Sequence, residues 1–118
     1  TRLWTPPDAP WANPSSATVF ARELERLKLS ITAGKKLGGF VPGGARTIAL
    51  GHYPPRYSDG RETAAVPILK EAQAQVCVYG HLHGKDLKYG FQGVADGVRY
   101  YLASVDAIDF RPIPIELP

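Results

Sequence analysis

The sequence contains a single cysteine, Cys77. An intramolecular disulfide is therefore impossible, and a zinc site built on several cysteine thiolates is excluded. Cys77 also lies inside the apolar run "VCVY", where a cysteine usually behaves as a small hydrophobic residue rather than as a nucleophile. A reducing, cytoplasmic setting is the expectation that follows.

Long apolar runs are also lacking. No run approaches the roughly 20 residues that a membrane span needs, and "TRLWTPPDAP" has neither the basic start nor the apolar core of a secretion signal. The net charge is +3, but the lysines and arginines are dispersed. Dispersed charge gives little support for nucleic acid as a structural partner, although a modest positive field suits an anionic small substrate. We expect no membrane and no nucleic-acid partner.

The 118 residues are enough for one domain with a core of its own. Residues 1–15 are rich in proline and include both tryptophans, which predicts an extended arm that lies on the rest of the domain. An amphipathic helix that ends near Gly34 is predicted next, because apolar residues recur at helical spacing. These residues are Phe20, Leu24, Leu27 and Ile31.

Two short apolar runs, 47–52 and 76–80, predict buried strands. Pro67 suits the first turn of a short helix between them. A strand, helix and strand in this order predict a parallel pair with a right-handed crossover. The remaining residues, with the turn-like "ADG" and the runs "VRYYLASV" and "IPIEL", predict a hairpin-like or meandering β region.

All three histidines fall where these two strands end. His52 follows the first strand, and His81 and His83 follow the second. The carboxyl ends of neighbouring parallel strands lie about 5 Å apart, so imidazoles from both loops can reach one ion. Imidazole serves Zn, Fe, Ni and Mn alike. Spacing alone leaves open both metal binding and an ordinary structural role.

Two motifs carry a resemblance to a known family. "GHYPP" at 51–55, followed after a short helix by "VYGHLHG" at 78–84, resembles the second half of a calcineurin-like metallophosphoesterase. The resemblance implies half of a four-layer αββα sandwich, an α/β fold in which helices flank a mixed sheet. It also implies hydrolysis of phosphoesters at two divalent metal ions (Mn, Fe or Zn), with His52 and His81 as ligands of one ion and His83 as a ligand of the other.

The Asp and Asn ligand motifs of the family's first half do not occur in this sequence. We therefore expect residues 1–118 to be the C-terminal portion of one metallophosphoesterase domain, with no catalytic residue of its own and inactive alone. The expected partners are a phosphoester substrate and the missing N-terminal half or a second copy of the chain. A non-catalytic metal-binding or interaction module, and a nickel or zinc sensor that uses three histidines, stay open as alternatives.

Two residues beside the histidines are candidates for binding the substrate. Tyr53 can stack on it or donate to a phosphate, although packing within its proline-rich loop fits equally well. Arg56 can contact phosphate oxygens, in bidentate fashion. Asp106 and Asp109 follow a β run and are expected to cap a turn rather than to bind metal.

Overall fold

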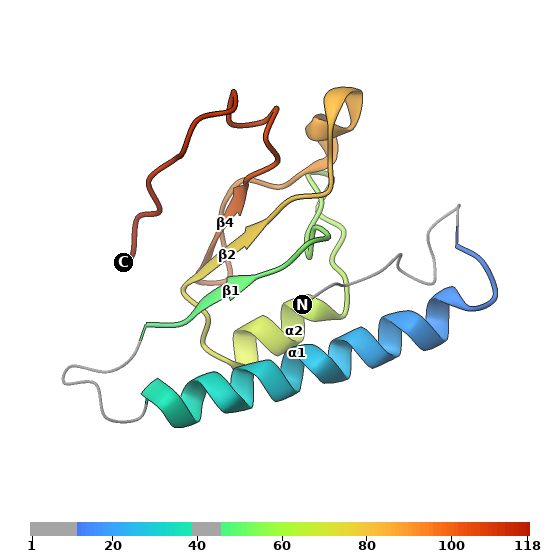
Figure 1. Cartoon of the computed structure of the whole chain (residues 1–118), viewed down its shortest axis with the longest axis vertical. Helices are drawn as coiled ribbons and strands as arrows, with labels where there is room; N and C mark the ends of the chain where they lie inside the picture. Colours follow the sequence, from blue (N-terminus) through green and yellow to red (C-terminus); the bar gives the residue numbers. More distant parts are fainter. Residues whose placement is uncertain (1–11, 39–45) are drawn as a thin grey trace.

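The computed structural model describes residues 12–38 and 46–118, which form an α/β domain with a four-stranded mixed sheet (Figure 1). The strand order is β1-β2-β4-β3; β1, β2 and β4 are parallel, and β3 is antiparallel to β4. The elements are α1 (Ser16–Gly38), β1 (Ile48–Leu50), α2 (Ala65–Glu71), β2 (Val76–Tyr79), the 3-10 helix η1 (Gly84–Tyr89), β3 (Gly93–Ala95) and β4 (Val98–Leu102). Helices flank a mixed sheet, as the sequence predicts.

Part of the predicted arm and part of the loop after the first helix lie outside the described residues. These parts are residues 1–11, which include both tryptophans, and residues 39–45.

The predicted amphipathic helix is confirmed as α1, which ends at Gly38 rather than near Gly34. A single glycine costs a helix only about 1 kcal/mol, so the good helix formers around Gly34 carry the helix further. Phe20 and Leu27 of the predicted stripe are buried. Leu27 forms a cluster with Ala65 of α2, which joins the two helices.

Glu23 is a buried charge that the stripe does not predict. It is 1% exposed and lies three residues after Phe20 and four before Leu27, on the face that packs inward. Its Oε1 accepts a hydrogen bond from Arg26 Nη1 at 2.6 Å, and Arg22 Nε lies 3.4 Å away. A buried carboxylate is tolerated when charged donors compensate it, which these two arginines do.

The crossover from β1 through α2 to β2 is the central topological unit of the fold. Ile48 pairs with Val76 and Leu50 with Val78, which confirms a parallel pair. In Figure 1, α2 lies between the sheet and α1. The main core lies between the sheet and the helices and consists of Leu69, Ala74, Cys77, Tyr79, Val98, Tyr100 and Leu102.

The hairpin predicted near "ADG" joins β3 to β4. Asp96 and Gly97 have φ of 52° and 79°, the positive values that a two-residue hairpin turn of type I′ requires. The "IPIEL" run forms no strand, because Pro112 and Pro114 offer no backbone donors. It runs instead along the side of the sheet opposite α1 (Figure 1). There the Glu116 N–H donates to the hydroxyl of Tyr101 at 3.2 Å.

The strand β1 is an edge strand within the part of the chain that the structure describes. Its Ile48 and Leu50 are 43% and 66% exposed, so they present apolar surface on the side away from the core. Over the described ranges, no helix is both long enough and apolar enough to cross a membrane.

Candidate metal centre

His52 and His81 meet at the carboxyl ends of β1 and β2. The backbone pairing of the two strands continues past their ends. The Gly51 N–H donates to the Val78 carbonyl at 2.9 Å, and the Gly80 N–H donates to the His52 backbone carbonyl at 3.1 Å. As a result, Nδ1 of His81 lies 3.2 Å from Nε2 of His52. The predicted approach of the two loops is confirmed.

His81 occupies a strained turn. Its φ is 71°, in the left-handed region that residues with a Cβ rarely adopt, and the Leu82 N–H donates to the Gly80 carbonyl at 2.9 Å. A three-residue turn with positive φ at its centre is rare and costs energy. Gly84 has a positive φ of 55°, which glycine adopts readily, whereas His81 adopts its positive φ with a Cβ present.

The environment of His81 lowers the pKa of its imidazole. Partial burial of the ring is the main cause, and the nearby His52 and His83 add to it because a second positive charge would be repelled. The ring of His81 is therefore neutral at physiological pH. A neutral imidazole has a free lone pair, which is the form that binds metal.

His83 has a carboxylate partner. Its Nδ1 lies 2.8 Å from Oδ1 of Asp106, and Gly84 N–H donates to Oδ2 of the same side chain at 2.7 Å. The Gly84 hydrogen bond is the main cause that lowers the pKa of Asp106 below its ordinary value of 3.8. The side chain of Asp106 thus binds the loop after β2 instead of capping its own turn, because the pairing of β4 with β2 brings the two loops together. Asp109 is exposed, and its Oδ2 lies 3.7 Å from Arg111 Nε.

The donor set fits part of a metal site. Two imidazole nitrogens that bind one ion at about 2.0–2.1 Å stand about 3.2 Å apart when the angle between their bonds is about 100°. The separation of 3.2 Å between His81 Nδ1 and His52 Nε2 is compatible with this arrangement, and in the protein without metal it is a hydrogen-bond distance. However, no group of three or more His, Cys, Asp or Glu side chains within residues 12–38 and 46–118 is arranged to hold an ion. His52 and His81 thus have the spacing of two ligands, and the described residues do not form a complete ligand set.

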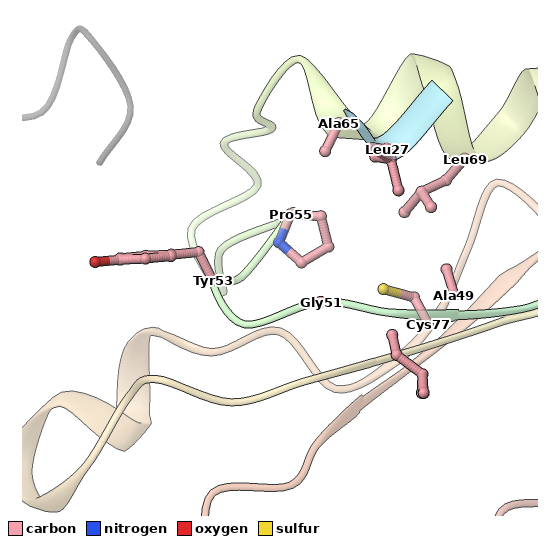
Figure 2. Close-up of a pocket in the computed structure, with 9 residues that line it drawn as sticks. Leu27, Ala49, Gly51, Tyr53, Pro55, Ala65, Leu69 and Cys77 are labelled. Carbon is pink, nitrogen blue, oxygen red and sulfur yellow. The ribbon is translucent and has the colours of Figure 1, made fainter. Parts of the chain in front are cut away.

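Tyr53 lies against this histidine pair. Its ring centroid is 3.9 Å from that of His81, with the two planes inclined by 35°. Figure 2 shows the Tyr53 ring directed away from the apolar side chains of Leu69 and Cys77. Tyr53 therefore lies at the same edge as the histidines, and its role in substrate binding stays a prediction.

Arg56 is turned toward the interior. Its side chain is 11% exposed; its Nη2 lies 2.5 Å from Asp96 Oδ2 and also forms an ion pair with Glu62. The guanidinium stands 5.6 Å from the centroid of Phe91 and 5.9 Å from that of Tyr100. With two carboxylates bound and two rings beside it, Arg56 is engaged as a structural residue. Its predicted contact with substrate stays a prediction.

The cavity in Figure 2 lies between β1, the helices and the loop after β1, and it is apolar. Cys77 lines it, together with Leu69 and Pro55. Burial raises the pKa of the Cys77 thiol to about 12. The thiol stays protonated at neutral pH, which confirms the prediction of a buried, hydrophobic cysteine.

Sequence reasoning missed the contribution of the loop after β4. Ser104 is 5% exposed, and its hydroxyl has no hydrogen-bond partner in the described part of the chain. This hydroxyl lies 3.7 Å from the place that a Cβ on Gly80 would occupy. Ser104 and Asp106 reach the histidine edge only because β4 lies beside β2, and no local sequence pattern announces that pairing.

Comparison with protein-family models, with curated proteins and with solved structures gives no match to this chain. A proposal for the function therefore has to rest on the two contacts at the carboxyl edge of the sheet, between His52 and His81 and between His83 and Asp106.

Proposed function

We propose that this chain supplies the imidazole ligands of a calcineurin-like metallophosphoesterase, which hydrolyses phosphoesters once its ligand set is complete. One observation carries the proposal: Nδ1 of His81 and Nε2 of His52 lie 3.2 Å apart, at the strand ends where ligands gather in parallel sheets. The order of "GHYPP" and "GHLHG" along the chain agrees with the proposal.

His52 and His81 would hold one divalent ion, and His83 would contribute to the second. When bound, ions such as Mn, Fe or Zn would supply Lewis acidity toward a phosphoryl oxygen and an activated water. Neutral imidazoles suit this role because they bind a cation without cancelling its charge, and the lowered pKa of His81 keeps its imidazole neutral. Tyr53 would present its hydroxyl to a phosphoester at the same edge.

The remaining ligands must come from outside the described residues. We propose that the missing N-terminal half of the domain, or a second copy of the chain, supplies them and completes a four-layer αββα sandwich. The exposed Ile48 and Leu50 of β1 support this association, because an edge strand offers both apolar surface and unpaired backbone groups. Light scattering on the purified chain tests it, and a single monomeric species at all concentrations would contradict the second-copy form.

Metal binding and turnover together test the function. We would measure the binding of Mn²⁺ and Zn²⁺ by titration calorimetry and the hydrolysis of an aryl phosphate ester in the same samples, with the chain associated with the partner that completes its ligand set. His81→Ala should weaken binding and abolish turnover, whereas Asp109→Asn, an exposed control on the loop after β4, should change neither. Binding that is equal in wild type and in a His52→Ala, His81→Ala double variant would overturn the proposal.

A non-catalytic metal-binding or interaction module is the second candidate. The exposed apolar side chains of Ile48 and Leu50 on the edge strand β1 favour its interaction form. Metal binding that depends on His81 without turnover, even when the chain is fully associated, would select this candidate.

A further inference from the structure

We propose that Asp106 is a positioning residue that fixes the ring orientation and the tautomer of His83, so that the Nε2 lone pair of His83 is presented at the carboxyl edge of the sheet. The two residues come from different loops, 23 positions apart in the sequence. The assignment of the tautomer concerns the protein without metal. Its consequence for metal affinity rests on the proposed function.

The tautomer follows from which atom can donate. An ionised carboxylate only accepts hydrogen bonds, so at the 2.8 Å contact with Asp106 Oδ1 the donor is Nδ1 of His83. A neutral imidazole carries one N–H, and placing it on Nδ1 leaves the lone pair on Nε2. The partner of His83 therefore selects one of two tautomers that are otherwise close in energy.

The carboxylate is held firmly enough to impose this choice. Its second oxygen, Oδ2, accepts the backbone N–H of Gly84 at 2.7 Å, so rotation of the side chain would break two hydrogen bonds. The backbone around it forms a turn in which the N–H groups of Ala107 and Ile108 donate to the Ser104 carbonyl at 2.9 and 3.2 Å. Hydrogen bonds thus hold both the side chain of Asp106 and the backbone turn around it.

Packing alone does not orient His83. Its side chain is 58% exposed, whereas that of Asp106 is 29% exposed. A ring with so little surrounding it is free to turn unless a specific partner holds it. The hydrogen bond to Asp106 is therefore the main constraint on the direction in which Nε2 points.

The two histidines of "HLH" consequently present different nitrogens. His81 directs Nδ1 toward Nε2 of His52, while His83 commits Nδ1 to Asp106 and keeps Nε2 for a ligand. A carboxylate behind an imidazole ligand raises its basicity, and removal of such a partner typically weakens metal binding about 10–100-fold.

The first test reads the tautomer directly in the metal-free protein. Nitrogen NMR of protein labelled at histidine, at a pH where the rings are neutral, should show His83 with its proton on Nδ1. Asp106→Ala should move a large share of that proton to Nε2. Asp106→Asn, which keeps the shape of the side chain, should have an intermediate effect because its amide has one acceptor oxygen. Asp109→Asn should leave the His83 signals unchanged.

The second test reads metal affinity. We expect Asp106→Ala to weaken Zn²⁺ binding about 10–100-fold, with no further loss when it is added to His83→Ala. A tautomer that does not respond to either Asp106 variant would overturn the inference. If the fully associated wild type binds no Zn²⁺ but the tautomer still depends on Asp106, the proposed function fails and the positioning role stands.

Discussion

Nδ1 of His81 lies 3.2 Å from Nε2 of His52, although 29 positions separate the two residues in the sequence. Backbone hydrogen bonds beyond the ends of β1 and β2 bring the loops to this distance. The pairing places strain on one member, because His81 has a φ of 71°. The geometry of the candidate site thus costs stability that the rest of the fold must supply.

The strained turn predicts that His81→Gly is more stable than His81→Ala by about 1 kcal/mol, because glycine adopts positive φ without a steric penalty. Both variants remove the imidazole, so the difference isolates the backbone. The matched pair at His83, where φ is −137°, should rank in the opposite order. Urea unfolding of the four variants measures this, and alanine ranking above glycine at both positions would contradict it.

The contacts of Arg56 predict a role in stability. Arg56→Ala should lower the free energy of unfolding by about 2–3 kcal/mol, because Glu62 and Asp96 lose a buried partner. Arg56→Lys should restore only a minor part of the lost stability, since a single ammonium group cannot bind the carboxylates of both Glu62 and Asp96. Arg61→Ala, in the same loop but 63% exposed at its side chain, should cost less than about 1 kcal/mol. Unaffected stability combined with reduced turnover would instead favour the predicted contact of Arg56 with substrate.

Asp96 predicts a dependence of stability on pH. Its pKa is lowered from 3.8, first by the hydrogen bond from Lys70 and also by Arg56. A carboxyl group with a lowered pKa in the folded state contributes stability above its ordinary pKa and loses this contribution as the pH falls through the folded value. Wild type should therefore be more stable than Asp96→Asn at neutral pH. The difference in the free energy of unfolding between the two proteins should disappear as the pH falls below 3.8. A gap that stays constant with pH in urea unfolding would show that the charge of Asp96 is not its source.

The burial of Cys77 predicts an inert thiol. With a pKa raised to about 12 and 3% exposure, Cys77 should not react with an aromatic disulfide reagent at pH 8 until the protein unfolds. The measurement is the rate of thiol modification with and without denaturant. Cys77→Ser should lower the free energy of unfolding by about 1–3 kcal/mol, because a buried hydroxyl needs a hydrogen-bond partner. Cys77→Ala should lower it by less. Rapid labelling of the folded protein would contradict this prediction.

Local patterns predicted the elements of this fold well. The spacing of Phe20 and Leu27, the apolar runs of β1 and β2 and the position of Pro67 each depend on a few neighbouring residues. The position of His52 and His81 at neighbouring strand ends followed from the same reasoning, because a strand, helix and strand in series restrict the possible topologies.

Other features depend on pairings that the sequence does not encode locally. Asp106 reaches His83 only because β4 lies beside β2. Arg56 turns inward because Asp96, 40 positions away, stands behind it. The left-handed φ of His81 goes against the preference of a residue with a Cβ, so no local pattern predicts it.

The register of the parallel strands has a consequence for how the chain folds. Ile48 pairs with Val76, and Val76 with Arg99, so each parallel pairing requires the closure of a chain segment of more than 20 residues. Such non-local closure slows folding, whereas α1 and α2 can form from local contacts alone. We therefore expect the helices to form before the sheet, and His52 and His81 to meet only once β1 and β2 have paired. A partly folded chain would retain its helical signal while His52 and His81 stayed apart.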